Sequence, residues 1–142
     1  MIKNNTTSGT IDKLDFLCGH WIGHGNSLGD SVKGTLVVQH RFQNTFIELT
    51  ETLCNEENKC IHEDCTWIAF DEKKKHFHAV QFMAPGMVES KMVLLTENGC
   101  RWWMGPQAPW VDFISIDENH LRIEIRTPLQ PEPETWITYK RQ

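Results

Sequence analysis

The chain has 142 residues, which suits one domain with an apolar core that needs no disulfide or metal ion to stabilise it. Its formal net charge of −5 argues against non-specific nucleic-acid binding, which requires a basic face. Six tryptophans and seven phenylalanines against one tyrosine supply large apolar surfaces, which suit a barrel interior, a ligand cavity or a solid core.

Residues 1–9 are polar and lack the apolar stretch of a signal peptide, so they predict a disordered leader. No apolar run in the chain is long enough to cross a bilayer, which predicts no membrane insertion. Together these features favour a cytoplasmic protein. Residues 10–142 are expected to form a single domain, because the chain has neither an internal repeat nor a low-complexity linker.

Residues 10–18 predict a short helix or a pair of turns. Ile11, Leu14, Phe16, Leu17 and Cys18 fall near one helical stripe. Gly19 is expected to end it, since glycine commonly follows the last turn of a helix.

After this element the apolar residues alternate with polar ones, which is typical of β-strands separated by hairpin turns. Besides a strand that follows the helix directly, we expect strands within residues 34–42, 44–54, 61–70, 76–83, 87–95, 100–105, 110–116, 120–127 and 135–141. No second helical segment interrupts them. An all-β, closed antiparallel barrel of about ten strands follows, because closure removes the sheet edges, and such a barrel has room for a ligand.

The cysteine pattern argues against a thiolate zinc site, because the five cysteines include no Cys-x-x-Cys pair. Cys54 and Cys60 flank the polar loop 55–59 and could face each other across a hairpin. A disulfide there would need an oxidising compartment, so two free thiols are the favoured interpretation.

The stretch FLCGHWIGHG, residues 16–25, contains the string Phe-Leu-x-Gly-x-Trp-x-Gly-x-Gly. This string resembles the start of the nitrobindin family and of related bacterial fatty-acid-binding-protein-like barrels of the calycin type. The resemblance implies a calycin-like barrel whose N-terminal helix plugs one end, with Trp21 packed beneath it. It also implies that three glycines let the first strand bend and approach its neighbour, namely Gly19, Gly23 and Gly25.

The resemblance extends more weakly over most of the chain and bears on haem. His62 occupies the place of the family's pocket histidine, in a strand with an acidic residue after it. Near the C-terminus, Glu134 (or Glu132, if the gap is placed differently) stands where the family has the histidine that ligates haem iron. A carboxylate is a poor axial ligand for ferrous haem compared with imidazole. The resemblance therefore implies the barrel. The glutamate in place of the iron-ligating histidine disfavours haem, and with it the chemistry on nitric oxide or peroxynitrite that haem would support.

Two tryptophan features bear on the barrel interior. Arg141, near the C-terminus, is expected to stack on Trp21 and close the barrel end by a cation–π contact. Trp102 and Trp103 are adjacent, so they must face opposite sides of a strand, and one of them should line the interior.

The histidines predict no metal site. His20 and His24 lie about 13 Å apart on a strand, which is too far for one ion. His76 and His78 share a strand face and could chelate a metal ion, but a polar row that faces solvent is the favoured interpretation. If His76 and His78 face solvent, the alternate residues of this strand point inward, namely Phe77, Ala79, Gln81 and Met83.

No catalytic residue is expected either. The chain has no Gly-x-Ser-x-Gly elbow, and neither His40 nor His120 has an obvious acidic or nucleophilic partner in the sequence. Glu48, Glu51, Asp64 and Glu89 provide carboxylates on the expected strands, and alternation places Glu48 and Glu51 on opposite faces. Some strand carboxylate is therefore expected to enter the cavity, where burial would raise its pKa, and the sequence leaves open which one.

These observations favour a protein that binds a small, largely apolar molecule inside the barrel. The candidate ligand-binding residues are His62, Gln81, Met83 and Glu134, chosen from the resemblance and from strand phase. Two alternatives remain: a haem protein that acts on nitric oxide or peroxynitrite, and a barrel filled by its own tryptophans that serves as an interaction module. A non-enzymatic role without cofactor is favoured, and the sequence leaves open whether the chain forms a homodimer.

Overall fold

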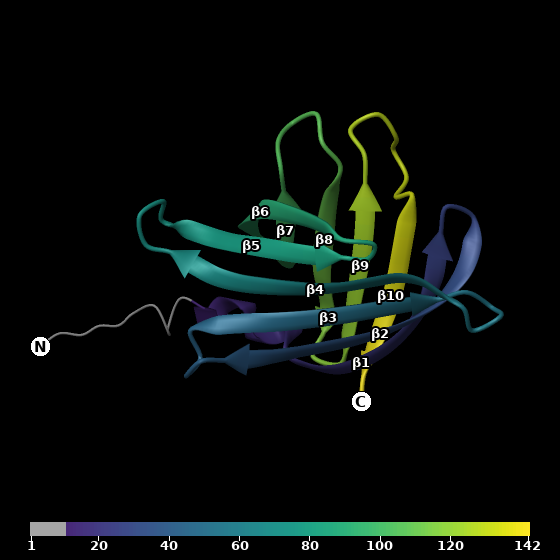
Figure 1. Ribbon diagram of the computed structural model, residues 1–142, viewed down its shortest axis with the longest axis horizontal. Helices are drawn as coiled ribbons and strands as arrows, with labels where there is room; N and C mark the ends of the chain where they lie inside the picture. The colour runs from purple at the N-terminus through teal and green to yellow at the C-terminus, as the bar shows by residue number, and fades with distance from the viewer. Residues whose placement is uncertain (1–10) are drawn as a thin grey trace, which may run out of the picture.

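The computed structural model describes residues 11–142, and the expected leader at 1–9 lies outside the described residues (Figure 1). The first element is a 3-10 helix, η1 (Asp12–Leu17). Ile11, Leu14 and Leu17 are all fully buried. Their spacing of three residues matches the three residues per turn of a 3-10 helix, so these side chains lie on one face of the segment.

Ten strands follow the helix, and every strand expected from the alternation is present. They are β1 (Gly19–Ser27), β2 (Asp30–Arg41), β3 (Phe46–Cys54), β4 (Cys60–Asp71), β5 (His76–Met83), β6 (Met87–Thr96), β7 (Gly99–Trp103), β8 (Trp110–Asp117), β9 (His120–Arg126) and β10 (Thr135–Arg141). Each strand pairs antiparallel with the next, and β1 also pairs with β10 to close the barrel. The predicted fold class is therefore confirmed.

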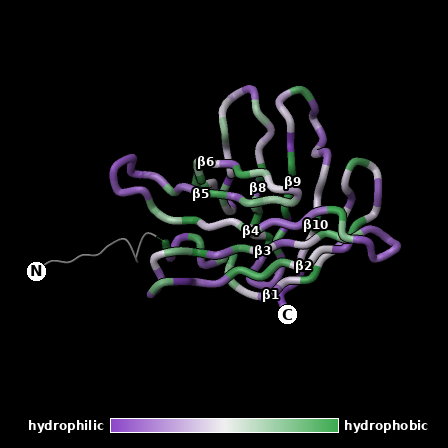
Figure 2. Tube along the Cα trace, viewed as in Figure 1, coloured by the Kyte–Doolittle hydropathy of each residue, from purple (hydrophilic) through white to green (hydrophobic). Residues whose placement is uncertain are grey.

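Two walls of the barrel face each other in Figure 1, where β2–β5 cross in front of β7–β10 at a steep angle. The inward residues of both walls form the apolar core, and the turn between β4 and β5 is strongly hydrophilic (Figure 2). The described part of the chain contains no helix with the length and apolarity that a membrane span requires. All five cysteines are free thiols, although Cys54 and Cys60 are direct cross-strand partners.

One end of the barrel is closed by η1, Trp21 and Arg141. The Trp21 indole Nε1 donates a hydrogen bond to the Leu17 carbonyl at 2.9 Å, and its ring is 2 % exposed. The Arg141 guanidinium lies over this ring, with Cζ 4.1 Å from the ring centroid, and it donates to the carbonyl oxygens of Cys18 and Glu118. The expected contact between the two ends of the chain is thus present, and it joins η1 to β10.

The glycine at position 25 lets β1 and β10 approach each other. A Cβ added to Gly25 would overlap the carbonyl oxygen of Trp136 and lie 2.7 Å from the Cα of Ile137. Both atoms belong to the backbone of β10, so they cannot move aside without disturbing the strand pairing.

We therefore expect Gly25→Ala to lower the free energy of unfolding by about 2–3 kcal/mol, the cost of overpacking a well-packed site. Urea unfolding followed by far-UV circular dichroism measures the change. His24→Ala is the control, because the His24 side chain on the same strand is exposed. Equal stabilities of the two variants would show that β1 and β10 can separate at little cost.

Candidate ligand-binding cavity

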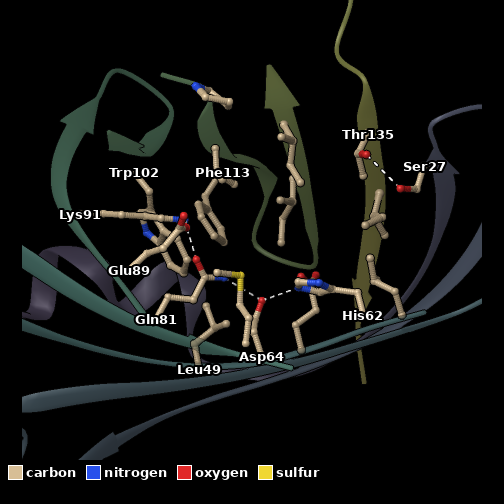
Figure 3. A pocket seen from close by; sticks show the side chains of 18 of the residues that line it. Ser27, Leu49, His62, Asp64, Gln81, Glu89, Lys91, Trp102, Phe113 and Thr135 are labelled. Carbon is tan, nitrogen blue, oxygen red and sulfur yellow. Dashed lines mark hydrogen bonds and ion pairs between the residues drawn. The ribbon is translucent and has the colours of Figure 1, made fainter. Parts of the chain in front are cut away.

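The barrel encloses a cavity of about 400 Å³ (Figure 3). It lies toward the end opposite η1, because the lining residues include Ser27 at the end of β1, Met83 at the end of β5 and Met104 just after β7. The register of the barrel places these strand ends together, whereas η1 joins the start of β1. One end of the barrel is thus plugged by the helix, and the other contains the cavity.

The cavity has an apolar side that comes from β7–β10. We call it the apolar wall, formed by Trp102, Val111, Phe113, Ile123, Ile125 and Ile137. The Trp102 and Phe113 rings pack against each other with centroids 4.6 Å apart. Trp102 is thus the inward member of the tryptophan pair, as strand alternation requires.

The opposite side, from β4–β6, carries a row of hydrogen-bonded polar groups that we call the polar row: His62, Asp64, Gln81, Lys91 and Glu89. Asp64 Oδ2 lies 2.7 Å from His62 Nε2 and accepts a hydrogen bond from Gln81 Nε2 at 2.9 Å. Gln81 Oε1 accepts from Lys91 Nζ at 2.5 Å, and Lys91 Nζ lies 3.3 Å from Glu89 Oε1. These bonds fix the orientation of the Gln81 amide, and Figure 3 shows the row running along one side of the cavity.

Strand phase explains why the polar row faces inward. His62 and Asp64 are two residues apart on β4, and Glu89 and Lys91 are two apart on β6, so each pair shares a strand face. Gln81 lies opposite Glu89 in the β5–β6 register, which connects the pairs. Lys91 is only 7 % exposed, so its charge is stabilised by its partners in the polar row rather than by bulk water.

Glu51 extends the polar side of the cavity, and Tyr139 supports it from outside the lining. The Tyr139 hydroxyl, fully buried, donates a hydrogen bond to Glu51 Oε2 at 2.5 Å. Burial raises the pKa of Glu51 to about 7, and the nearby Asp64 carboxylate adds to this effect. Burial and the Glu51 charge also raise the pKa of Tyr139, while the hydrogen bond to Asp64 raises the pKa of His62.

These pKa shifts predict that stability falls as pH rises. Glu51 ionises near pH 4.5 when unfolded but near pH 7 when folded, so between these values the folded state binds more protons. The raised pKa of His62 acts in the same direction, because its stabilising contribution is lost as pH rises through the folded pKa. We expect the free energy of unfolding to fall by on the order of 2 kcal/mol from pH 5 to pH 8.

Urea unfolding at several pH values, in buffer with a chelator, measures this slope. Glu51→Gln should flatten it, whereas Glu48→Gln, on the same strand and outside the cavity, should leave it unchanged. An equally steep slope in Glu51→Gln would assign the pH dependence to other groups.

Three of the four residues expected to bind ligand line the cavity, namely His62, Gln81 and Met83. Glu134 is not among the lining residues. It precedes β10, in which Thr135 and Ile137 face the cavity, so alternation turns position 134 away from it. The Glu134 backbone instead bonds to Ile125 and Leu28, which ties the β9–β10 loop to its neighbours.

Sequence reasoning did not single out Lys91 and Tyr139. The feature of the sequence that could have identified Lys91 is its place in the alternation of β6, because it lies on the same inward face as Val93, which is buried. For Tyr139 the signal was that it is the only tyrosine, on an inward position of the last strand. Neither signal shows that their partners would be Gln81 and Glu51, which lie on other strands.

A second group of polar side chains lies at the closed end. His40 Nε2 is 2.7 Å from Asp15 Oδ1, and Cys18 is close to both. Burial raises the pKa of the Cys18 thiol to about 11, so this thiol stays protonated at neutral pH. The rings of His76 and His78 lie 6.5 Å apart on β5, and no third ligand residue joins them among residues 11–142.

Comparisons with known proteins give a likeness in fold. No protein-family model matches the chain, and no curated protein matches it. Among solved structures, a de novo designed fluorescence-activating β-barrel is similar, with a TM-score of 0.47 and 13 % sequence identity. The match covers 92 % of this chain and 98 % of the designed one. This likeness concerns the fold alone.

Proposed function

We propose that the barrel binds a small, largely apolar molecule that carries one polar group. The observation that supports this most directly is the two-sided cavity, in which the apolar wall faces the polar row across about 400 Å³. Small-molecule sites in proteins commonly combine such an apolar lining with a few placed polar groups, in cavities of roughly 300–1,000 Å³.

The two sides would have different roles in binding. The rings of Trp102 and Phe113 offer a broad apolar surface for the body of the ligand. Gln81 and Asp64 are held in place by their own hydrogen bonds, so they are preorganised to orient a polar group at low entropic cost. Met83, at the cavity end of β5, adds a flexible apolar contact near the mouth.

The resemblance of residues 16–25 to nitrobindin-type barrels adds to this proposal, but the cavity does not fit haem. His62 is the one imidazole among the described lining residues, and its Nε2 is engaged with Asp64 Oδ2 at 2.7 Å. Glu134, at the place of the family's iron ligand, is not at the cavity. The lining residues from β9 and β10 include no imidazole, thiol or carboxylate: they are Ile123, Ile125, Thr135 and Ile137.

The cavity also favours ligand binding over a barrel filled by its own tryptophans. Of the six tryptophans, Trp102 lines the cavity and Trp21 lies at the plugged end, yet about 400 Å³ remains open between the walls. A filled interaction module would have no such space.

Titration with N-phenyl-1-naphthylamine tests the proposal, because this apolar probe carries one N–H group and fluoresces brightly in apolar surroundings. We expect saturable binding at one site per chain. Native mass spectrometry of the freshly purified protein adds a second readout, namely the mass of any co-purified molecule. A linear, non-saturating fluorescence response with no co-purified mass would contradict the proposal.

A further inference from the structure

We propose that Glu51, His62 and Asp64 form a binding site for one divalent transition-metal ion, with Zn²⁺ as the representative ion. Each of the three side chains offers one ligand atom, and these atoms all lie within 4.8 Å of one another. Imidazole nitrogen and carboxylate oxygen are both Zn²⁺ ligands. This proposal is independent of the small-molecule ligand and goes beyond the sequence, which predicted no metal site.

Asp64 gives the independent indication that a ligand belongs here. Its side chain is 6 % exposed, and its Oδ1 atom is buried with no hydrogen-bond partner among the described residues. A buried carboxylate oxygen without a partner costs roughly 1–3 kcal/mol or more, and such atoms are rare in folded proteins. A bound cation would satisfy this oxygen.

The charges at the site also favour a cation. Glu51 and Asp64 bring two carboxylates together beside an apolar wall, and Lys91 does not lie between them, because its Nζ bonds to Gln81 and pairs with Glu89. Two like charges in such surroundings repel each other strongly. A divalent ion would neutralise both at once.

The surrounding hydrogen bonds resemble the outer shell of a metal site, which orients the ligands. The Tyr139 hydroxyl holds Glu51 through Oε2, and the Gln81 amide holds Asp64 through Oδ2. Each carboxylate therefore has a positioning partner from another strand. Outer-shell bonds of this kind keep ligand carboxylates in place, and their loss typically weakens metal binding 10–100-fold.

The geometry needs only a small adjustment. In a tetrahedral zinc site with bonds of about 2.1 Å, ligand atoms lie roughly 3.4 Å apart. His62 Nε2 and Asp64 Oδ2 are 2.7 Å apart, so the ion would replace their direct hydrogen bond (Figure 3). Three protein ligands leave at least one coordination position for water or for an oxygen of a molecule in the cavity.

The test is Zn²⁺ binding by the full chain at pH 7.5, after EDTA treatment and in competition with a chromophoric chelator. We expect one Zn²⁺ per chain at this site, and at least 10-fold weaker binding in both Asp64→Asn and Glu51→Gln. Two controls should bind Zn²⁺ like the wild type. Glu89→Gln removes a cavity carboxylate outside the trio, and His40→Gln removes the histidine of the Asp15–Cys18–His40 group.

A second readout identifies the site directly. The imidazole ¹⁵N signals of His62 should shift on addition of one equivalent of Zn²⁺, and this shift should be absent in Asp64→Asn. Far-UV circular dichroism and thermal unfolding establish that each variant is folded. Zn²⁺ affinity that is unchanged in Asp64→Asn and Glu51→Gln, or lost in His40→Gln alone, would overturn the proposal. Intact probe binding in that case would leave the proposed function standing.

Discussion

Trp21→Ala is expected to lower the free energy of unfolding by about 3–5 kcal/mol, the usual cost of truncating a buried tryptophan. The Trp21 side chain is almost fully buried and contacts both ends of the chain, through Leu17 in η1 and Arg141 in β10. Its removal would leave a cavity beneath the plug and break the cation–π contact. Because typical domains are stable by about 5–15 kcal/mol, this change would remove a large part of the total stability.

Urea unfolding followed by far-UV circular dichroism measures the effect. Trp21→Phe separates packing from hydrogen bonding, since it keeps an aromatic ring but loses the bond from Nε1 to the Leu17 carbonyl. We expect it to cost less than Trp21→Ala. A decrease of less than about 1 kcal/mol in Trp21→Ala would mean that η1 contributes little to closing the barrel.

Ile125→Trp is expected to weaken the binding of N-phenyl-1-naphthylamine at least ~10-fold. A 10-fold loss of affinity corresponds to about 1.4 kcal/mol of binding free energy. The burial of one apolar group contributes at least this much, so blocking one apolar contact is enough to cause it. Ile125 lies on the apolar wall near the end of β9 and is partly exposed. A larger ring there would occupy cavity volume. Ile125 is preferred over Ile123, which is buried more deeply and would tolerate a larger side chain less well.

Ile116→Trp is the matched control, because Ile116 lies on β8 with its side chain exposed and outside the lining of the cavity. Fluorescence titration of both variants gives the comparison, and thermal unfolding checks that each is folded. Equal affinities of Ile125→Trp and the wild type would place the probe outside the cavity.

The two-sided cavity has a consequence for how a ligand would be selected. Apolar contacts with the wall distinguish molecules mainly by size, whereas Gln81 and Asp64 can reject a molecule that leaves them unpaired. The polar row, rather than the wall, would therefore set specificity. The proposed metal site lies at one end of this row, where His62 and Asp64 meet Glu51.

The sequence by itself determined the barrel, the positions of its strands and the inward face of β5. Alternation is a local property with a period of two, so it predicted the strand positions and turned Gln81 and Met83 inward. The apolar stripe within residues 10–18 likewise predicted a short helix or a pair of turns, and Ile11, Leu14 and Leu17 are the residues of this stripe that the structure buries fully. Local patterns were sufficient here because neighbouring strands in the barrel are also neighbours in the chain.

Only the tertiary structure decided which inward groups meet. Glu51 bonds to Tyr139 across 88 positions of the chain. The strand carboxylates that line the cavity are Glu51, Asp64 and Glu89, whereas Glu48 does not line it. Glu134 was chosen from the resemblance to a family pattern, and the phase of β10, in which Thr135 and Ile137 line the cavity, places it outside the lining. Partners brought together by barrel closure depend on register and strand tilt, which no local pattern of residues encodes.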